Sequence, residues 1–215
     1  MDQTSATVFI VDDDADVRGG LLRLFRSASW NAKAFASAAE FLDQAPVDGV
    51  GCILLDVSMP GMSGPDLHSA LAGRGFTYPV VYLTGNSTVA IGVGAMKKGA
   101  VDFLEKPVDD EVLLRAVEQS IARHRDALAV HGRSIDIRRR LDALSAREHE
   151  VLRHVIRGRL NKQIAFDLGI ALKTVKVHRG RVMAKMQVRS VAELVRLCET
   201  EDIAPLLAAG AAPPP

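Results

Sequence analysis

Residues 51–64 read GCILLDVSMPGMSG, and this stretch decides the fold of the first half of the chain. Cys52–Leu55 is an apolar run without alternation, which is typical of a strand buried on both faces of a parallel sheet. The run stops at Asp56 and passes into a Ser, Pro and Gly segment that cannot extend a strand. Parallel sheets bind ligands at the carboxyl ends of their strands, so Asp56 is a candidate functional residue. The alternative is that Asp56 only caps a turn.

Short apolar segments alternate with amphipathic ones on both sides of this stretch, through about residue 122. We expect strands at 7–11, 33–35, 52–56, 79–83 and 102–105, and helices at 15–28, 37–44, 65–72, 87–98 and 109–123. Strands that alternate with helices over short connections predict a doubly wound α/β domain with a five-stranded parallel sheet.

Polar side chains follow the predicted strands, which favours the functional interpretation of Asp56. They are Asp12, Asp13 and Asp14 after the first strand, Asp56 after the third, Thr84 after the fourth and Lys106 after the fifth. The carboxyl ends of parallel strands share one edge, so these groups should converge. Clustered carboxylates favour a small hard cation such as Mg²⁺ (or Mn²⁺). A lysine opposite that ion leaves a pocket suited to a phosphoryl group on Asp56.

Composition bounds the class of protein. The chain has 215 residues, of which 48% are hydrophobic and 25% are charged, as in ordinary soluble domains. Two widely separated cysteines without CxxC spacing give no indication of a disulfide framework or a zinc site. We find neither a signal peptide nor an apolar run of about 18 residues, so we expect a cytoplasmic protein without membrane contact.

Charge is divided between the two halves of the chain. Residues 1–122 hold 9 Lys and Arg against 16 Asp and Glu, whereas residues 123–200 hold 18 against 8. This division predicts two domains with different partners, and the basic half is the one expected to bind a polyanion.

The basic half predicts an all-α, four-helix domain. Ser145 and Glu148 have the spacing of a capping box at the start of a helix over 146–157, and Asn161 is expected to cap a short helix over 162–168. A basic helix over about 172–186 and a last helix over 191–199 follow. Two helices joined by a tight turn, the second one basic, predict a helix-turn-helix that fits the major groove of DNA.

The predicted recognition helix has one buried and one exposed face. Val175, His178, Val182 and Met186 share the face expected in the core. Lys176 and Val177 are the expected base contacts. The residues expected at phosphates are Lys162, Thr174, Arg179, Arg181 and Lys185, and Lys173 lies on the same exposed face.

These patterns divide the chain into a phosphoacceptor domain over 1–122, a helical linker over 123–143, a DNA-binding domain over 144–200 and a tail over 201–215 that we expect to be disordered. The linker is either one continuous helix to about Leu141 or a helix with a hinge near Gly132.

The first half resembles the receiver domain of two-component response regulators, through VDDD at 11–14, LLDVSMPGMSG at 54–64, LTG at 83–85 and FLEKP at 103–107. The resemblance implies a flavodoxin-like strand order, 2-1-3-4-5. It implies that Asp56 is the phosphoacceptor and that Asp13, Asp56 and the Ser58 carbonyl hold Mg²⁺, with Asp12 acting through a water. It also implies the roles of Lys106 and Thr84 at the phosphoryl oxygens, Phe103 as an aromatic switch, and a cis Lys106–Pro107 bond.

The second half resembles the LuxR-type helix-turn-helix, through LSAREHEVL at 144–152, NKQIAFDLGI at 161–170 and TVKVHRGRVMAKM at 174–186. Ala171 stands where that pattern commonly has a capping Ser. The whole chain resembles a NarL/FixJ-family regulator, most of all its FixJ-like members. This implies a sensor histidine kinase as phosphodonor and double-stranded promoter DNA as target. It also implies a homodimer through the face of helix 87–98, strand 102–105 and helix 109–123. RNA polymerase is a further candidate partner.

Three alternatives remain open at this point. The chain could be a phosphohydrolase with Asp12 as nucleophile, rather than a regulator whose own chemistry is limited to gaining and losing the phosphoryl group. It could be a regulator that is never phosphorylated, or an RNA-binding protein, although it lacks the aromatics that stack bases.

Gly92 and Gly94 also suggest that the helix over 87–98 is marginally stable.

Overall fold

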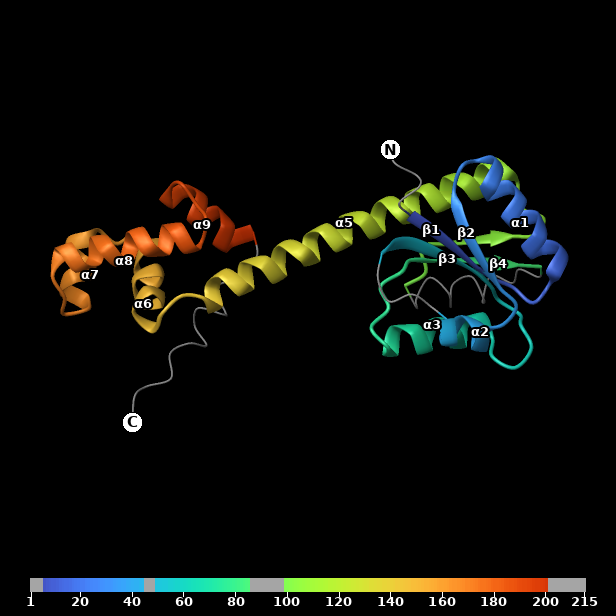
Figure 1. The fold of residues 1–215 in the computed structure, drawn as a ribbon, viewed down its shortest axis with the longest axis horizontal. Coiled ribbons are helices and arrows are strands. Elements are labelled where there is room, and N and C mark those ends of the chain that lie inside the picture. Colours follow the sequence, from blue (N-terminus) through green and yellow to red (C-terminus); the bar gives the residue numbers. More distant parts are fainter. Residues whose placement is uncertain (1–5, 45–48, 86–98, 201–215) are drawn as a thin grey trace. The chain divides into compact units, whose positions relative to one another are not determined.

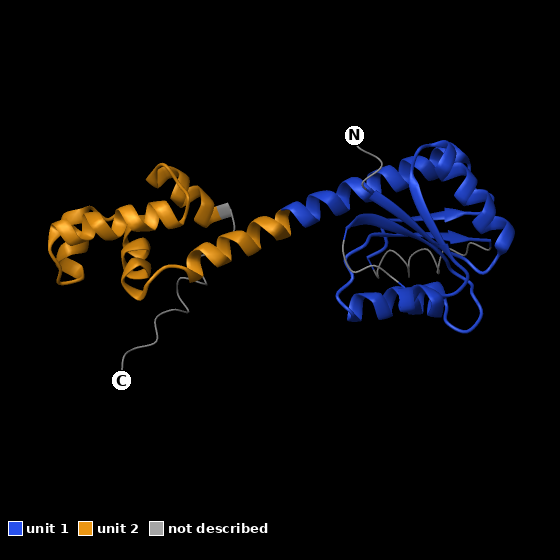
Figure 2. Cartoon of the chain, in the orientation of Figure 1, with its two compact units in different colours: residues 1–129 blue, residues 130–215 orange. Residues whose placement is uncertain are grey.

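The structure, a computed structural model, describes residues 6–44, 49–85 and 99–200. The helix expected over 87–98, with its two glycines, and the tail over 201–215 lie outside the described residues. The chain forms two compact units, residues 1–129 and residues 130–215 (Figure 2).

Five strands of the first unit form one parallel sheet in the order β2-β1-β3-β4-β5, which confirms the predicted topology (Figure 1). The strands are β1 (Ala6–Val11), β2 (Asn31–Phe35), β3 (Val50–Asp56), β4 (Val80–Thr84) and β5 (Asp102–Glu105). Asp56 pairs with Leu83, and Thr84 pairs with Glu105. The register therefore aligns the carboxyl ends of neighbouring strands at one edge.

Each face of the sheet has its own core. Helices α2 (Ala38–Gln44) and α3 (Gly64–Gly73) cover one face, and helices α1 (Ala15–Ser27) and α5 (Asp110–Asp142) cover the other (Figure 1). Successive strand residues point to opposite faces, so β3 contributes Ile53 to one core and Leu54 to the other. Burial on both sides explains why the sequence of β3 is uninterruptedly apolar.

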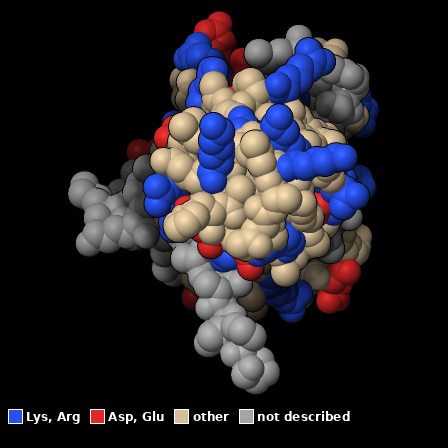
Figure 3. Space-filling view, turned by 90° about the vertical axis from the view of Figure 1, so that its left-hand side faces the viewer, with Lys and Arg blue, Asp and Glu red and all other residues tan. Residues whose placement is uncertain are grey.

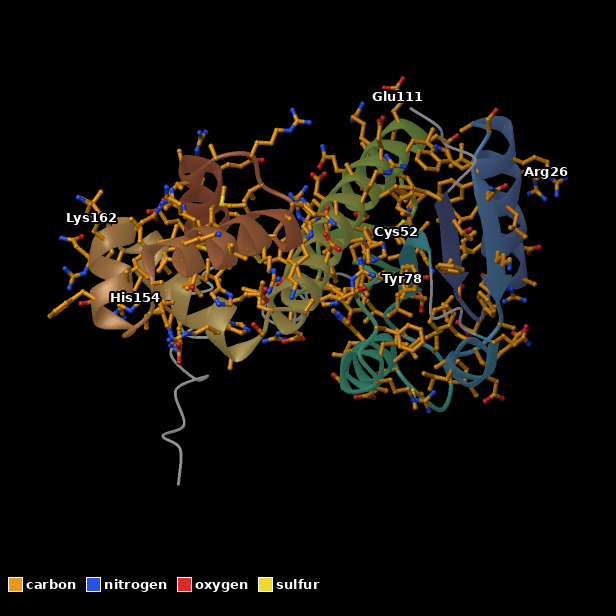
Figure 4. The ribbon with its side chains drawn as sticks, turned by 60° about the vertical axis from the view of Figure 1, so that its left-hand side comes forward. Arg26, Cys52, Tyr78, Glu111, His154 and Lys162 are labelled. Carbon is orange, nitrogen blue, oxygen red and sulfur yellow. The ribbon has the colours of Figure 1, made fainter. Side chains whose placement is uncertain are left out.

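A buried histidine fastens α5 to the amino end of β3. The Nδ1 atom of His124 accepts a hydrogen bond from the Gly51 N–H at 3.2 Å, and Nε2 lies 3.2 Å from the Thr77 hydroxyl. The ring centroids of Tyr78 and His124 are 4.9 Å apart. Tyr78 is labelled in Figure 4. A Cβ at Gly51 would lie 2.4 Å from the Thr7 carbonyl oxygen, so only glycine fits there. Burial lowers the pKa of His124, which favours its neutral form.

The second unit contains the four predicted helices, α6 (Ala146–Ile156), α7 (Asn161–Asp167), α8 (Leu172–Lys185) and α9 (Val191–Thr200). Ser145 and Glu148 form the predicted capping box. Helix α5 passes through Gly132 without interruption to Asp142, which decides between the two alternatives for the linker. Its last turns are part of the second unit, since Ile137 and Leu141 are buried in the same core as α6 and α8.

One predicted cap is wrong. Asn161 does not precede α7 but is its first residue, and Leu160 occupies the N-cap position. The Leu160 N–H donates to Oε1 of Gln163 at 2.9 Å instead, so a side chain one turn into the helix satisfies the backbone group at its start.

Candidate functional site

Three polar side chains are buried at the carboxyl edge of the sheet. Asp12 follows β1, Asp56 ends β3 and Thr84 ends β4, and each is almost completely inaccessible to solvent. The three strands are neighbours in the sheet, so side chains far apart in sequence share one small volume. Burying two carboxylates so close together is costly unless positive charge lies between them.

Lys106 supplies that charge. Its Nζ donates to Oδ2 of Asp12 at 2.6 Å and to Oδ1 of Asp56 at 2.5 Å. The Lys106 N–H donates to the Thr84 carbonyl at 2.7 Å, which places the residue at the end of β5. The Lys106–Pro107 bond is cis, as expected. The predicted convergence of Asp12, Asp56 and Lys106 is therefore present in the structure.

The two oxygens of Asp56 have different partners. Oδ1 contacts Lys106, and Oδ2 accepts a hydrogen bond from the Ser58 N–H at 2.8 Å. Burial raises the pKa of Asp56, while the hydrogen bond and charge of Lys106 oppose that rise. For Lys106, burial alone would lower the pKa, but the bonds to Asp12 and Asp56 outweigh it and raise the pKa. The Asp56 carboxylate is therefore held in place and is more basic than usual, and the Lys106 ammonium beside it stays charged. This pair is suited to accept an anionic electrophile.

Two residues that the sequence did not single out support this pocket. Gly64 begins α3 so close to β3 that a Cβ would lie 2.2 Å from the Asp56 carbonyl oxygen. Arg18 of α1 donates from Nη1 to the Asp12 carbonyl at 2.7 Å and fixes the β1–α1 connection. Gly64 was visible in the quoted motif, but its close approach to Asp56 depends on tertiary packing.

The two predicted switch residues lie on neighbouring strands. Thr84 is buried at the end of β4, and Phe103 of β5 is partly buried against the core that α2 and α3 cover. Phe103 pairs in register with Tyr82, two residues before Thr84. Thr84 and Phe103 therefore lie on adjacent strands, two residues apart in register.

The donor set for a divalent cation is made of oxygen atoms. Asp12 and Asp56 are buried and converge, whereas Asp13 and Ser58 are exposed at the rim. Among the described residues, no group of three or more His, Cys, Asp and Glu side chains is arranged to hold a metal ion. In this arrangement Lys106 lies between the two buried acids. The chemistry of the acids and of the Ser58 carbonyl nevertheless fits a hard cation such as Mg²⁺.

The second unit exposes a row of polar and basic side chains on α8. Val175 and Val182 are completely buried, while Lys173, Thr174, Lys176, Val177 and Arg181 are exposed, as predicted. His178 is partly buried, and its Nδ1 atom is buried without a hydrogen-bond partner. Lysines and arginines are prominent on the face of this unit that Figure 3 turns toward the viewer.

Two of the predicted phosphate contacts already have partners within the domain. Arg179 donates from Nη1 to Oδ1 of Asn161 at 2.7 Å and so links α8 to the start of α7. Lys185 donates from Nζ to Oε2 of buried Glu148 at 2.7 Å and to the Ala143 carbonyl at 2.9 Å. No local sequence pattern pointed to this second cluster, which links α8 to α6.

Two family models match the chain. Residues 8–118 match the response regulator receiver domain, and residues 142–198 match the luxR family of bacterial regulatory proteins. The chain belongs to the NarL/FixJ family of response regulators.

Relatives of this response regulator align over nearly its whole length. Nodulation protein W of Bradyrhizobium diazoefficiens is 42% identical over 93% of this chain and 88% of the relative. Transcriptional regulatory protein FixJ of Azorhizobium caulinodans is 44% identical over 94% of this chain and 95% of the relative. The solved structure of the response regulator StyR superposes with a TM-score of 0.86 at 42% identity, over 92% of this chain and all of StyR.

Membership of this family confirms the predicted class of function. The response regulator is a phosphorylation-dependent transcriptional regulator with a DNA-binding domain. Its family consists of transcriptional regulators rather than metabolic enzymes, so the phosphohydrolase alternative is not supported. Among the described residues, none of the helices combines the length and the apolar character needed to span a membrane.

Proposed function

We propose that the regulator accepts a phosphoryl group on Asp56 from a phosphohistidine of a sensor kinase and then binds promoter DNA as a dimer. The observation that supports this most is the single Lys106 ammonium held against both Asp12 and Asp56. In the transfer, an Asp56 carboxylate oxygen attacks phosphorus and the phosphorus–nitrogen bond of the donor breaks. The electron pair of that bond stays on the histidine nitrogen.

Different residues around Asp56 bind different oxygens of the phosphoryl group. Lys106 moves from pairing with carboxylates to pairing with one phosphoryl oxygen, and the Thr84 hydroxyl donates to another. Asp13, Asp56 and the Ser58 carbonyl would hold Mg²⁺ (or Mn²⁺), with Asp12 acting through a water. The cation supplies the positive charge that offsets the acids and the incoming phosphoryl group.

The donor reaches this pocket from the side of α1. An apolar groove of about 900 Å³ lies between α1 and the start of α5, lined by Leu21, Leu24 and Leu113 among others, and it extends to Lys106 and Leu83. An apolar groove that ends beside the reacting lysine suits a helical donor domain whose histidine must approach Asp56.

Phosphorylation changes the conformation of the β5–α5 side of the receiver. A hydroxyl drawn toward the phosphoryl group leaves room beside β4, and Phe103 turns inward to fill it. We propose that β5 and α5, together with the helix expected over 87–98, then form the homodimer face. Two DNA-binding domains thereby reach half-sites about one turn of DNA apart.

The proposed DNA contacts follow from exposure on α8. Lys176 and Val177 meet base edges, as a donor to guanine and an apolar surface for the thymine methyl. Contacts to phosphates come from Lys162, Lys173, Thr174, Arg179 and Arg181. Lys185 is left out of this set because its ammonium is paired with Glu148.

Phosphorylation and DNA binding test the proposal together. The wild-type protein is incubated with acetyl phosphate and Mg²⁺, the modified residue is located by peptide mass spectrometry, and footprinting on DNA selected from a random library is compared with and without the donor. We expect one labelled residue, Asp56, and tighter footprints after labelling. Asp56→Asn should lose both effects.

The same experiment separates the alternatives. Label on Asp12 that survives in Asp56→Asn would favour the phosphohydrolase. Footprints that do not respond to complete labelling of Asp56 would favour a regulator that signals through protein contacts alone.

A further inference from the structure

Arg18, in the first turn of α1, reaches back to the connection between β1 and α1. Its Nη1 atom donates to the carbonyl oxygen of Asp12 at 2.7 Å, across six positions of the chain. The Asp14 side chain caps the same helix, and the Arg18 N–H donates to the Asp14 carbonyl at 3.1 Å. The backbone of Arg18 is therefore fixed by the helix, while its guanidinium holds the residues that precede the helix.

The bond from Arg18 completes the contacts of Asp12. The Asp12 N–H donates to the Phe35 carbonyl of β2 at 3.2 Å, and Oδ1 accepts from the Asp14 N–H at 2.9 Å. The other carboxylate oxygen, Oδ2, accepts from Lys106 at 2.6 Å. With Arg18 at the carbonyl, every polar atom of Asp12 has a partner, so the position of this buried residue is closely determined.

Asp13, the next residue, is placed through Asp12. Its side chain is exposed at the rim of the pocket, so packing does not determine its direction. The Asp12 carbonyl and the Asp13 N–H belong to one planar peptide group. A hydrogen bond that holds the carbonyl oxygen therefore also sets the plane from which the Asp13 side chain departs. Arg18 has no acceptor atom and cannot itself be a metal ligand, so any effect on a cation passes through this peptide group.

We propose that Arg18 is a positioning residue for the divalent cation: it orients the peptide group between Asp12 and Asp13 so that the Asp13 carboxylate is presented to Mg²⁺. This inference rests on the proposed function, because it takes Asp13, Asp56 and the Ser58 carbonyl as the atoms that hold the cation. It adds a residue of α1 to a site otherwise built from the ends of strands.

The charge of Arg18 acts in the opposite direction to its hydrogen bond. A guanidinium stays protonated and repels a dication, so removing it would by electrostatics alone strengthen Mg²⁺ binding. Losing the fixed orientation of the peptide group would weaken binding instead. Groups that orient metal ligands typically contribute about 10–100-fold to metal affinity. Repulsion by a half-buried guanidinium is screened by solvent and salt, so we expect the hydrogen bond to dominate.

The test measures cation binding and phosphorylation separately in the full-length regulator. Binding of Mn²⁺ to the unphosphorylated protein is followed by electron paramagnetic resonance of the free ion at constant ionic strength. Labelling of Asp56 by acetyl phosphate is followed as the Mg²⁺ concentration is varied. Arg18→Met removes the charge and the donor, and Arg18→Lys keeps both. Arg26→Met is the matched control, because it removes the same charge from an exposed position in the last turn of α1 (Figure 4).

We expect Arg18→Met to weaken Mn²⁺ binding by about tenfold and to raise the Mg²⁺ concentration for half-maximal labelling by a similar factor. The labelling rate at saturating Mg²⁺ should stay within about twofold of wild type, which also verifies that the pocket is folded. Arg18→Lys should bind Mn²⁺ more tightly than Arg18→Met, since its ammonium can donate to the same carbonyl. Arg26→Met should match wild type in both assays.

Tighter Mn²⁺ binding by Arg18→Met would show that the guanidinium acts by charge alone, and it would overturn the inference. The same conclusion would follow from unchanged binding, from an equal loss in Arg26→Met, from no gain in Arg18→Lys, or from a lower labelling rate at saturating Mg²⁺ with unchanged half-saturation. In each of these cases the proposed function stands. A wild type that is not labelled at Asp56, or that is labelled equally well without a divalent cation, would overturn both.

Discussion

The ion pair between Lys185 and Glu148 gives a quantitative prediction, because the sequence placed Lys185 among the expected phosphate contacts and the structure pairs it with a buried carboxylate. Glu148 Oε2 accepts from Lys185 Nζ at 2.7 Å and from the Ser145 N–H at 2.8 Å. These bonds lower the pKa of Glu148 from 4.5 to about 2. We predict that Lys185 stabilises the second unit, so that replacing Lys185 mainly lowers the unfolding free energy of that unit.

The magnitude follows from the pKa. At about 1.4 kcal/mol for each pKa unit, the lowering corresponds to about 3.5 kcal/mol in favour of the charged carboxylate. Lys185 is 39% exposed, so solvent screening reduces the contribution to about 2 kcal/mol. Glu148→Gln and Lys185→Met should each lower the unfolding free energy of the second unit by about that amount. The double variant should lose much less than the sum.

Acid should weaken the same pair. The pKa of Glu148 is lower in the folded protein than in the unfolded chain, so its contribution is complete above pH 4.5 and is lost as the pH falls toward about 2. Glu148→Gln should show no such loss over this range.

Urea unfolding can report the two units separately. Trp30 is the only tryptophan of the chain and lies in the receiver, so its fluorescence follows the first unit, whereas far-UV circular dichroism follows helices in both. The transition seen by circular dichroism but not by fluorescence belongs to the second unit. Single variants that leave this transition in place while weakening DNA binding would refute the reasoning and restore Lys185 as a phosphate contact.

Three further predictions concern other residues. Burial lowers the pKa of His124 below its ordinary value of 6.5, so receiver stability should be complete above that pH and decrease as the pH falls below it. His124→Gln should flatten this dependence of the urea midpoint. Ala171→Ser should stabilise the second unit by about 1 kcal/mol in urea unfolding, since Ala171 is an extended N-cap without a side-chain hydrogen bond, and no gain would mean that the cap position is already satisfied. Lys176→Ala should cost about 1–3 kcal/mol of binding and relax sequence preference, while Arg181→Ala should weaken all sequences alike and reduce the salt dependence; identical behaviour of the two in binding titrations would contradict the division into base and phosphate contacts.

Much of the receiver was predictable because its pattern is local. A strand buried on both faces must be apolar along its length, so β3 could be located from Cys52–Leu55, and the carboxylate that ends it stood out. The same reasoning placed the capping box at Ser145, where two residues three positions apart satisfy each other's backbone groups. Periodicity also separated the buried Val175 and Val182 from the exposed Lys176.

Other features needed the tertiary structure because they join residues that are distant in sequence. Lys185 meets Glu148 across 37 positions, and His124 meets Gly51 across 73. No local pattern distinguishes such a lysine from one that projects into solvent. The position of Asn161 was also missed, since a Leu at the N-cap is satisfied by Gln163 rather than by its own side chain.

The sequence by itself determined the order of strands and helices, the acids, hydroxyl and lysine at the strand ends, and the basic helix, because periodicity and strand-end chemistry are properties of short segments. Only the tertiary structure decided that one ammonium spans Asp12 and Asp56, that α5 runs unbroken into the core of the second unit, and that Phe166 has no place in that core. Distances between remote side chains depend on how helices pack, and packing is a property of the whole fold.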